Sequence, residues 1–259
     1  MSNIPVICFG PNTDTFYIGC GMRYYAQNMP PTISNTLKKL PAIQIKWMSM
    51  DWDGQGWAVR DAYNNTKIIG HINKGLEFVS FGANKSIWFA GVSTGNWHGN
   101  LEDKMILKLN EVRAISPNFD AALEGILFGK GTTMVFIGKQ GFAYFTDEEA
   151  EGGKMESVLN EYIHRNPPWI LMHGSSLCLY NIDYYFLKFK DPNSNNIEMR
   201  WNLPMPMFEK LAELKAQAAR PESQLAIQQY ESLNMVAATG RLNVAIATSN
   251  AVNSLNRWY

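Results

Sequence analysis

The sequence predicts a mainly β protein with helices, in which about five β-β-β-α repeats form a β-propeller-like ring and an α-helical C-terminal tail follows. Two observations lead to this prediction. One sequence pattern recurs five times: an apolar strand, a turn containing Gly or Asp, and a second strand that begins with aromatic residues. The copies are spaced 31 to 47 residues apart, which is typical of propeller blades. Apolar residues at helical spacing follow four of the five copies. We therefore expect a repeat domain over residues 1–218 and a helical tail over residues 219–259.

Each copy begins with a short apolar strand that ends at a residue here called its anchor. The five anchors are Phe9, Met50, Phe81, Phe128 and Met172. Seven residues further on, where the second strand is expected, stand Phe16, Trp57, Trp88, Val135 and Leu179. Because Trp57 and Trp88 occupy the same repeat column, we expect both indoles in the core. In the fifth copy His173 falls in the turn, which favours an exposed turn residue.

A third strand and a helix complete most copies. Third strands are expected over residues 21–25, 66–70, 95–98, 141–145 and 197–201. Helices are expected over residues 31–40, 101–112, 155–164 and 206–219, where apolar residues recur every three or four positions. The second copy lacks a helix, which explains its short spacing of 31 residues.

The repetition itself has a physical reason. A three-stranded sheet with aromatic faces cannot bury them alone. Stacking several copies buries the aromatic columns in one core, and closing the stack into a ring also protects the sheet edges. An open stack and a sandwich of sheets are the alternatives to a ring.

The phrase Phe-Gly, four or five residues and then an aromatic residue occurs at Phe9-Gly10 and Phe81-Gly82, with a variant at Phe128-Gly129. It resembles the inner hairpins of WD-like propeller blades, without their Trp-Asp and Gly-His signatures. Followed by a helix, it is also similar to uncharacterised repeat proteins of fungi. The resemblance covers roughly residues 5 to 217. It implies a fold and is silent on activity.

The composition excludes several classes of protein. The chain has 259 residues, with 23 Lys+Arg and 23 Asp+Glu, so its formal net charge is zero. A neutral chain lacks the electrostatic footprint of a duplex nucleic-acid binder. Three cysteines cannot make a disulfide scaffold, and Cys8, Cys20 and Cys178 stand in apolar segments, as buried thiols do. With no signal peptide and no long apolar run, we expect a cytoplasmic protein without a membrane span.

Local motifs for metals and cofactors are missing from the sequence. The segment Asp51–Gly56 resembles the start of a calcium loop, but position 12 of such a loop is Ala62. Lys130 is followed by Gly131, which departs from the phosphate-loop pattern. The four histidines form no pair at metal-ligand spacing. We therefore expect neither a metal nor a cofactor.

The candidate ligand-binding residues are the polar and aromatic ones outside the repeat columns. They are Trp52, Asp53, Asn96, Trp97, His98 and Asn100. Indole rings stack on sugar rings, and Asn and Asp hydrogen-bond to hydroxyl groups, so this combination suits a ligand contact.

Three functions are consistent with these features. The first is a non-catalytic binding or protein-interaction module, because a propeller without catalytic motifs is most often a platform. The alternatives are a cytosolic carbohydrate-binding lectin, with a glycan in place of a protein partner, and an enzyme whose acids converge on the propeller axis. Asp51, Asp61 and Asp183 lie near strand ends and are the acids considered for the enzyme. The apolar, Asn-rich end of the tail is a candidate for self-association.

Overall fold

The chain folds into five small antiparallel sheets, each built from strands that are neighbours in sequence. This architecture is seen in a computed structural model that describes residues 4–68, 71–73, 75–92, 95–116, 118–147, 153–194 and 196–232. The prediction of a mainly β protein with helices is confirmed. The outer part of the predicted tail, residues 233–259, lies outside the described residues, and so does its predicted role in self-association.

The five sheets are numbered here in chain order. Sheet 1 contains β1 (Val6–Phe9), β2 (Phe16–Cys20) and β3 (Arg23–Gln27); sheet 2 contains β4 (Ile45–Met50), β5 (Trp57–Asp61), β6 (Thr66–Ile68) and β7 (His71–Asn73); sheet 3 contains β8 (Leu76–Phe81), β9 (Trp88–Val92) and β10 (Trp97–Asn100). Sheet 4 contains β11 (Leu123–Phe128), β12 (Met134–Gly138) and β13 (Gly141–Phe145); sheet 5 contains β14 (Ile170–Leu171), β15 (Ser176–Leu177), β16 (Tyr185–Lys190) and β17 (Ile197–Asn202).

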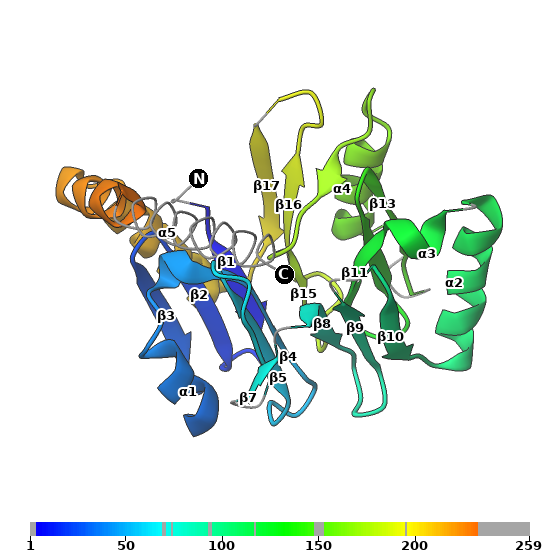
Figure 1. The fold of residues 1–259 in the computed structure, drawn as a ribbon, viewed down its shortest axis with the longest axis horizontal. Helices are drawn as coiled ribbons and strands as arrows, with labels where there is room; N and C mark the ends of the chain where they lie inside the picture. The colour runs from blue at the N-terminus through cyan, green and yellow to red at the C-terminus, as the bar shows by residue number, and fades with distance from the viewer. Residues whose placement is uncertain are drawn as a thin grey trace, which may run out of the picture.

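Helices follow every sheet except sheet 2, as the sequence predicts. They are α1 (Pro31–Leu37), the short 3-10 turn η1 (Ala42–Gln44), α2 (Asp103–Ile115), α3 (Phe119–Ala122), α4 (Lys154–Ile163) and α5 (Met205–Ala218). α5 buries Met207, Leu211, Leu214 and Ala218, which share one face at spacings of three and four. Figure 1 shows the sheets following one another around the molecule in chain order, with α1, α2, α4 and α5 on the outside. No helix in the described ranges is both long and apolar enough to cross a membrane.

Each sheet begins with the same hairpin. The residue after the first strand donates its N–H to the carbonyl of the residue before the second strand. The pairs are Gly10 to Thr15 (2.8 Å), Asp51 to Gly56 (2.9 Å), Gly82 to Ile87 (2.9 Å), Gly129 to Thr133 (3.0 Å) and Cys178 to Tyr184 (3.1 Å). In four of these turns an Asn or Asp side chain also accepts a backbone N–H two residues on, which fixes the turn locally.

The fifth anchor differs from the prediction. The residue that matches the other anchors is Leu177, which pairs with Tyr185 at the start of the second strand, and not Met172. Residues 179 and 180 lie in the turn. A tight turn at Gly174, where φ is +84°, breaks the first strand into β14 and β15, and both pieces pair with β16. The apolar run before this turn is what made Met172 look like a strand end.

Trp57 and Trp88, the two tryptophans of the same repeat column, differ from each other in burial. Trp57 is fully buried, because α1 covers it and its indole Nε1 donates to Thr32 Oγ1 at 3.1 Å. Trp88 is 37% exposed, so the prediction that it lies in the core is wrong. Two residues in the same repeat column occupy the same position in their strands. Their burial also depends on which helix or sheet covers that strand, and the repeat does not determine this. The three cysteines are buried, as predicted.

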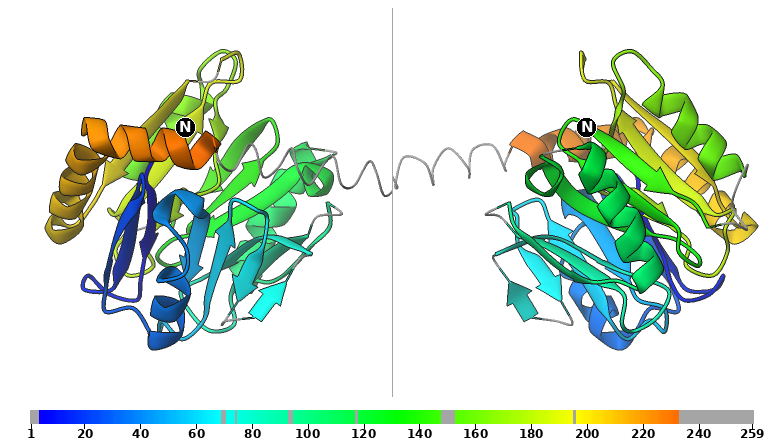
Figure 2. Two further views of the ribbon diagram at one scale, coloured as in Figure 1. Left: turned by 60° about the vertical axis from the view of Figure 1, so that its left-hand side comes forward. Right: turned by 90° about the vertical axis from the view of Figure 1, so that its right-hand side faces the viewer.

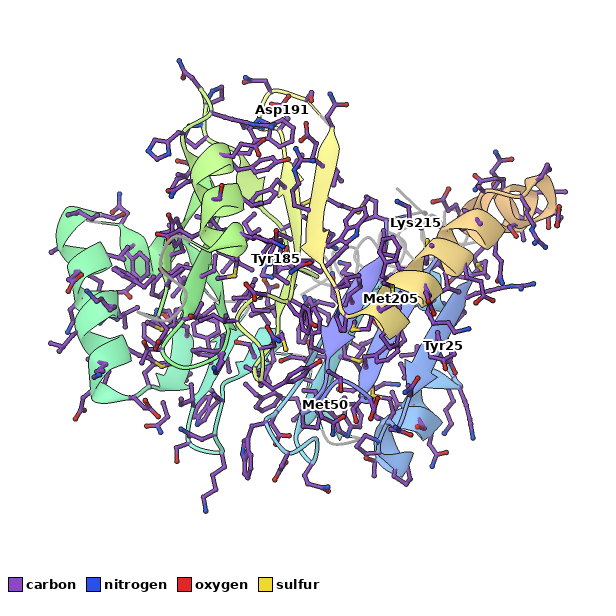
Figure 3. All side chains as sticks on the ribbon, turned by 180° about the vertical axis from the view of Figure 1, so that it is seen from behind. Tyr25, Met50, Tyr185, Asp191, Met205 and Lys215 are labelled. Atoms are coloured by element: carbon purple, nitrogen blue, oxygen red, sulfur yellow. The ribbon has the colours of Figure 1, made fainter. Side chains whose placement is uncertain are left out.

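The apolar cores lie between neighbouring sheets. One joins sheets 1 and 2 with α1, a larger one joins sheets 2 to 5 with α2 and α4, and a third joins sheet 5 to sheet 1 through α5. In the third, Phe16 of β2, Phe186 of β16 and Met207 of α5 belong to one cluster. Figure 3 shows α5, marked by Met205 and Lys215, alongside the strand that carries Tyr25. The first and last sheets therefore share a core.

The first strands also contact one another in order. β1 contacts β4, β4 contacts β8, β8 contacts β11, β11 contacts β15, and β15 contacts β1.

The tail begins with a second helix over residues 221–232. Ile227 is buried, and the Tyr230 hydroxyl accepts a hydrogen bond from Gln44 Nε2 in η1. Figure 2 shows this helix continuing beyond α5, past the end of the blue strands of sheet 1. The division into residues 1–218 and 219–259 stays a prediction.

Candidate functional site

Three first strands carry a β-bulge at the same place. The strand register slips between Ile45 and Trp47 in β4, between Leu76 and Phe78 in β8, and between Leu123 and Gly125 in β11. The extra residue in each bulge is charged: Lys46, Glu77 and Glu124. Each stands four residues before its anchor. A bulge re-aims the side chain of its extra residue, and bulges are frequent next to functional sites.

These three side chains line one cavity of about 690 Å³, called here the axial cavity. All five sheets contribute to it. Its lining includes Val6 from sheet 1, Trp47 and Arg60 from sheet 2, Glu77 from sheet 3, Glu124 from sheet 4, and Lys188 and Lys190 from sheet 5, together with Lys139 directly after β12 and with Met172 and His173 between β14 and β15. The volume falls within the range of roughly 300–1,000 Å³ that small-molecule sites occupy.

His173 occupies the position in sheet 5 that corresponds to the three bulges, since it stands four residues before Leu177. Its Nε2 lies 3.6 Å from Glu124 Oε2, and its ring packs on Phe78 with 4.8 Å between ring centroids. The Nδ1 atom is buried and has no hydrogen-bond partner among the described residues. The neighbouring His173 side chain lowers the pKa of Glu124 below its ordinary value. The expected exposed turn residue is therefore half-buried in the cavity wall.

Lys188 is the least exposed charged residue of the cavity lining. It is the fourth residue of β16, is only 5% exposed, and stands among the buried residues of that strand. Its backbone is fixed: the amide N–H donates to Ser175 Oγ at 2.9 Å, and the carbonyl accepts from Met172 N at 2.9 Å. Its Nζ lies against the Cα of Gly174, where a methyl group would collide with it. Burial alone lowers the pKa of Lys188 to about 8.

The Lys188 ammonium has no protein partner in the described part of the chain. No hydrogen bond and no ion pair reaches its Nζ there. Arg60, the fourth residue of β5, occupies the corresponding position in sheet 2 and is satisfied. It donates to Thr66 Oγ1 at 3.1 Å and to the Leu76 carbonyl, and it lies 3.5 Å from Glu77 Oε1.

Three further lysines, Lys46, Lys139 and Lys190, also line the cavity and are more exposed than Lys188, so they are nearer its mouth. Lys46 donates to Asn64 Oδ1 at 2.7 Å, and Lys139 to the Ala121 carbonyl at 2.8 Å. The lining therefore holds five cationic side chains against two carboxylates, 5 − 2 = +3, in a chain whose net charge is zero. The lining of the cavity is therefore net positive.

No protein-family model and no curated protein matches this sequence.

The chemistry of the cavity must therefore be inferred from its own residues. No cluster of three or more His, Cys, Asp or Glu side chains that could hold a metal ion occurs among the described residues. The acids Asp51, Asp61 and Asp183, considered from the sequence for an axial enzyme site, do not line the cavity.

The structure places the predicted ligand residues in two separate groups. Trp52 and Asp53 lie in the β4–β5 turn, where the Trp52 side chain is 42% exposed. The Asp53 carboxylate accepts the backbone N–H of Gln55 at 2.9 Å, which gives it a role in the turn. No hydrogen bond, ion pair or ring contact in the described parts joins this pair to the second group.

The second group, Asn96 to Asn100, lies on and before β10, and Asn96, Trp97 and His98 line an open groove of about 740 Å³, which Asn100 does not line. Trp97 Nε1 donates to Asp120 Oδ1 at 3.2 Å, and the Arg113 guanidinium lies over the indole ring, 5.3 Å from its centroid. His98 is exposed, and Asn100 Nδ2 donates to the Ser86 carbonyl at 2.6 Å. Ligand binding by these residues stays a prediction.

Sequence reasoning missed the axial cavity, although two signals pointed to it. One is the column four residues before each anchor, which holds Lys46, Glu77, Glu124 and, with the corrected fifth anchor, His173. The other is Lys188, a charged residue inside the apolar run Tyr184–Phe189. A lysine is almost never fully buried unless it is paired, so its presence inside a buried strand is informative.

Proposed function

We propose that this protein is a non-catalytic binding module built on a propeller-like ring of five sheets, and that its ligand occupies the axial cavity. The single observation that carries the proposal is that all five sheets contribute side chains to one cavity. Ligand sites form preferentially where several elements converge on one concave surface.

The contacts between sheets support a ring. The five first strands contact one another in sequence, and the last of them contacts the first. The shared core of sheet 1, sheet 5 and α5 supports the same closure. In an open stack, the first and last sheets would have no common core.

Purified protein provides the test. Glucose, spermidine, inorganic phosphate and citrate are each added, and the melting temperature is measured for the wild type and for Ile170→Trp, which fills space in the cavity wall. We expect at least one compound to raise the melting temperature of the wild type and to have less effect on Ile170→Trp. Equal shifts in both proteins, or no shift with any compound, would refute binding in the cavity. Circular dichroism checks that Ile170→Trp is folded.

Catalysis in the same cavity is a second candidate function, favoured by one observation. His173 and Glu124 lie 3.6 Å apart in the wall that also carries Lys188, so a base, an acid and an amine line one cavity. Such a cluster is the expected appearance of an active site. If the wild type chemically converts a bound compound and His173→Gln does not, catalysis replaces simple binding.

Carbohydrate binding at the Trp97 groove is less well supported. The Arg113 guanidinium already lies over the indole and bonds to Asp120 at 2.8 Å. A sugar that stacked on this face of the ring would have to displace it.

A further inference from the structure

The charges of the axial cavity indicate which class of ligand it takes. We propose that the cavity is an anion site for a small molecule bearing a phosphate or carboxylate group, with Lys188 as the inner cation and Lys46, Lys139 and Lys190 nearer the mouth. This inference rests on the proposed function, since it names the ligand of the same cavity.

The first argument is the missing partner of Lys188. A buried ammonium is costly unless a counter-charge and hydrogen bonds compensate it. The carboxylates of the cavity are already engaged, Glu77 with Arg60 at 3.5 Å and Glu124 with His173 at 3.6 Å. Burial is the sole cause that lowers the pKa of Lys188, so no neighbouring charge offsets it. A bound anion would supply the counter-charge that the described part of the chain lacks.

The second argument is the excess of cations over acids. Lys46, Lys139 and Lys190 form no ion pair with a carboxylate among the described residues. Lys46 has its pKa lowered by burial first and then by the nearby Arg60. These cations line the same cavity as Lys188. A polyvalent anion would balance their excess positive charge.

The third argument is shape. Lys188 is nearly enclosed, and the cavity holds about 690 Å³, so the ligand must be small or present a narrow anionic end. Duplex nucleic acid cannot bring a phosphate to a side chain at this depth. The phosphate or carboxylate group would therefore bind at Lys188, and the rest of the ligand would lie toward the three outer lysines.

Titration calorimetry tests the class of ligand. Inorganic phosphate, pyrophosphate and citrate are titrated at pH 7 into the wild type, Lys188→Met, Lys190→Gln and Lys85→Gln. Lys85 is the matched control, because it lies in the β8–β9 turn and does not line the cavity. We expect binding of at least one anion. Lys188→Met should weaken it at least about tenfold and Lys190→Gln a few-fold, because charge-assisted hydrogen bonds are lost. Lys85→Gln should leave it unchanged.

A labelling experiment on the wild type does not depend on any variant folding. Pyridoxal 5′-phosphate carries both a phosphate and an aldehyde. The Lys188 amine would attack the aldehyde carbon, the new C–N bond would form, and the carbonyl oxygen would leave as water. Added borohydride then delivers hydride to the imine carbon and fixes the label. Mass spectrometry of the digest should find Lys188 labelled ahead of the exposed lysines, and added pyrophosphate should protect it.

The outcomes separate this inference from the proposed function. The anion class is overturned if none of the three anions binds the wild type, or if Lys188→Met and Lys85→Gln bind them equally well. Labelling of exposed lysines with Lys188 untouched overturns it as well. If glucose or spermidine raises the melting temperature and the anions do not bind, the cavity remains a binding site for another class of ligand. If no compound affects the wild type, both proposals fail together.

Discussion

Lys188 should reduce the stability of the folded protein, and its replacement by Met should raise it. Met keeps an unbranched side chain of similar length and removes the charge. Burial lowers the pKa of Lys188 from 10.5 to about 8. Since a tenfold change in proton affinity is worth about 1.4 kcal/mol, burial of the charged amine costs about 3 kcal/mol near neutral pH.

The pH dependence follows from the direction of this change. Below pH 8 both the folded and the unfolded chain hold the proton, so the folded state bears the full cost. Between pH 8 and 10.5 the unfolded chain holds more protons than the folded one, so the cost declines as the pH rises. Lys188→Met should therefore be more stable than the wild type by up to about 3 kcal/mol at pH 7, and the gap should shrink toward zero near pH 10.5.

Urea unfolding at pH 7, 9 and 10.5, followed by circular dichroism, measures this difference. Lys190→Met is the control, because Lys190 stands two residues further along β16 and is only half-buried. It should change the free energy of unfolding by less than about 0.5 kcal/mol. The reasoning is refuted if Lys188→Met is less stable than the wild type at pH 7, or if the gap between them is the same at pH 7 and pH 10.5.

Four further substitutions test the packing of the sheets, each by urea or thermal unfolding. Trp57→Ala should cost about 3–5 kcal/mol and Trp88→Ala less than about 1 kcal/mol, because only the first indole is buried; equal losses would contradict this assignment. Tyr17→Phe should raise stability by about 1 kcal/mol, because the Tyr17 hydroxyl is buried and has no hydrogen-bond partner in the part of the chain that the structure describes; a clear loss would indicate a partner. Gly174→Ala should cost about 1–3 kcal/mol, because φ is +84° there and the new methyl would lie 2.7 Å from the Lys46 carbonyl and against Lys188 Nζ; an unchanged melting temperature would show that the turn relaxes.

The sequence predicts the local elements of this fold well, for a physical reason. The spacing of apolar residues depends only on the element that contains them, and the helices expected over residues 31–40 and 155–164 form over Pro31–Leu37 and Lys154–Ile163. The second copy has no helix, as predicted. The hairpin turns are equally local, because their side-chain hydrogen bonds span only two residues.

Features that depend on how two strands pair, or on which helix covers a strand, were not predictable in this way. A bulge is a property of two strands in register, so Lys46 and Glu124 gave no sign of it in the sequence. The exposure of Trp88 depends on which helix covers the strand. In the fifth copy, the turn at Gly174 moved the strand end by five residues, from Met172 to Leu177. With Met172 as the anchor, His173 does not align with the bulged residues Lys46, Glu77 and Glu124. For the same reason, Lys188 does not align with Arg60.

Arg60 and Lys188 provide the strongest contrast between the sheets, because they are the fourth residues of the corresponding strands β5 and β16. The Arg60 guanidinium is compensated by groups of the protein itself, because Thr66, the Leu76 carbonyl and Glu77 surround it. The fold offers no such group to Lys188 among the described residues. A cation that only stabilised the fold would be expected to resemble Arg60. The cost of Lys188 is therefore better explained by a ligand whose negative charge completes the site.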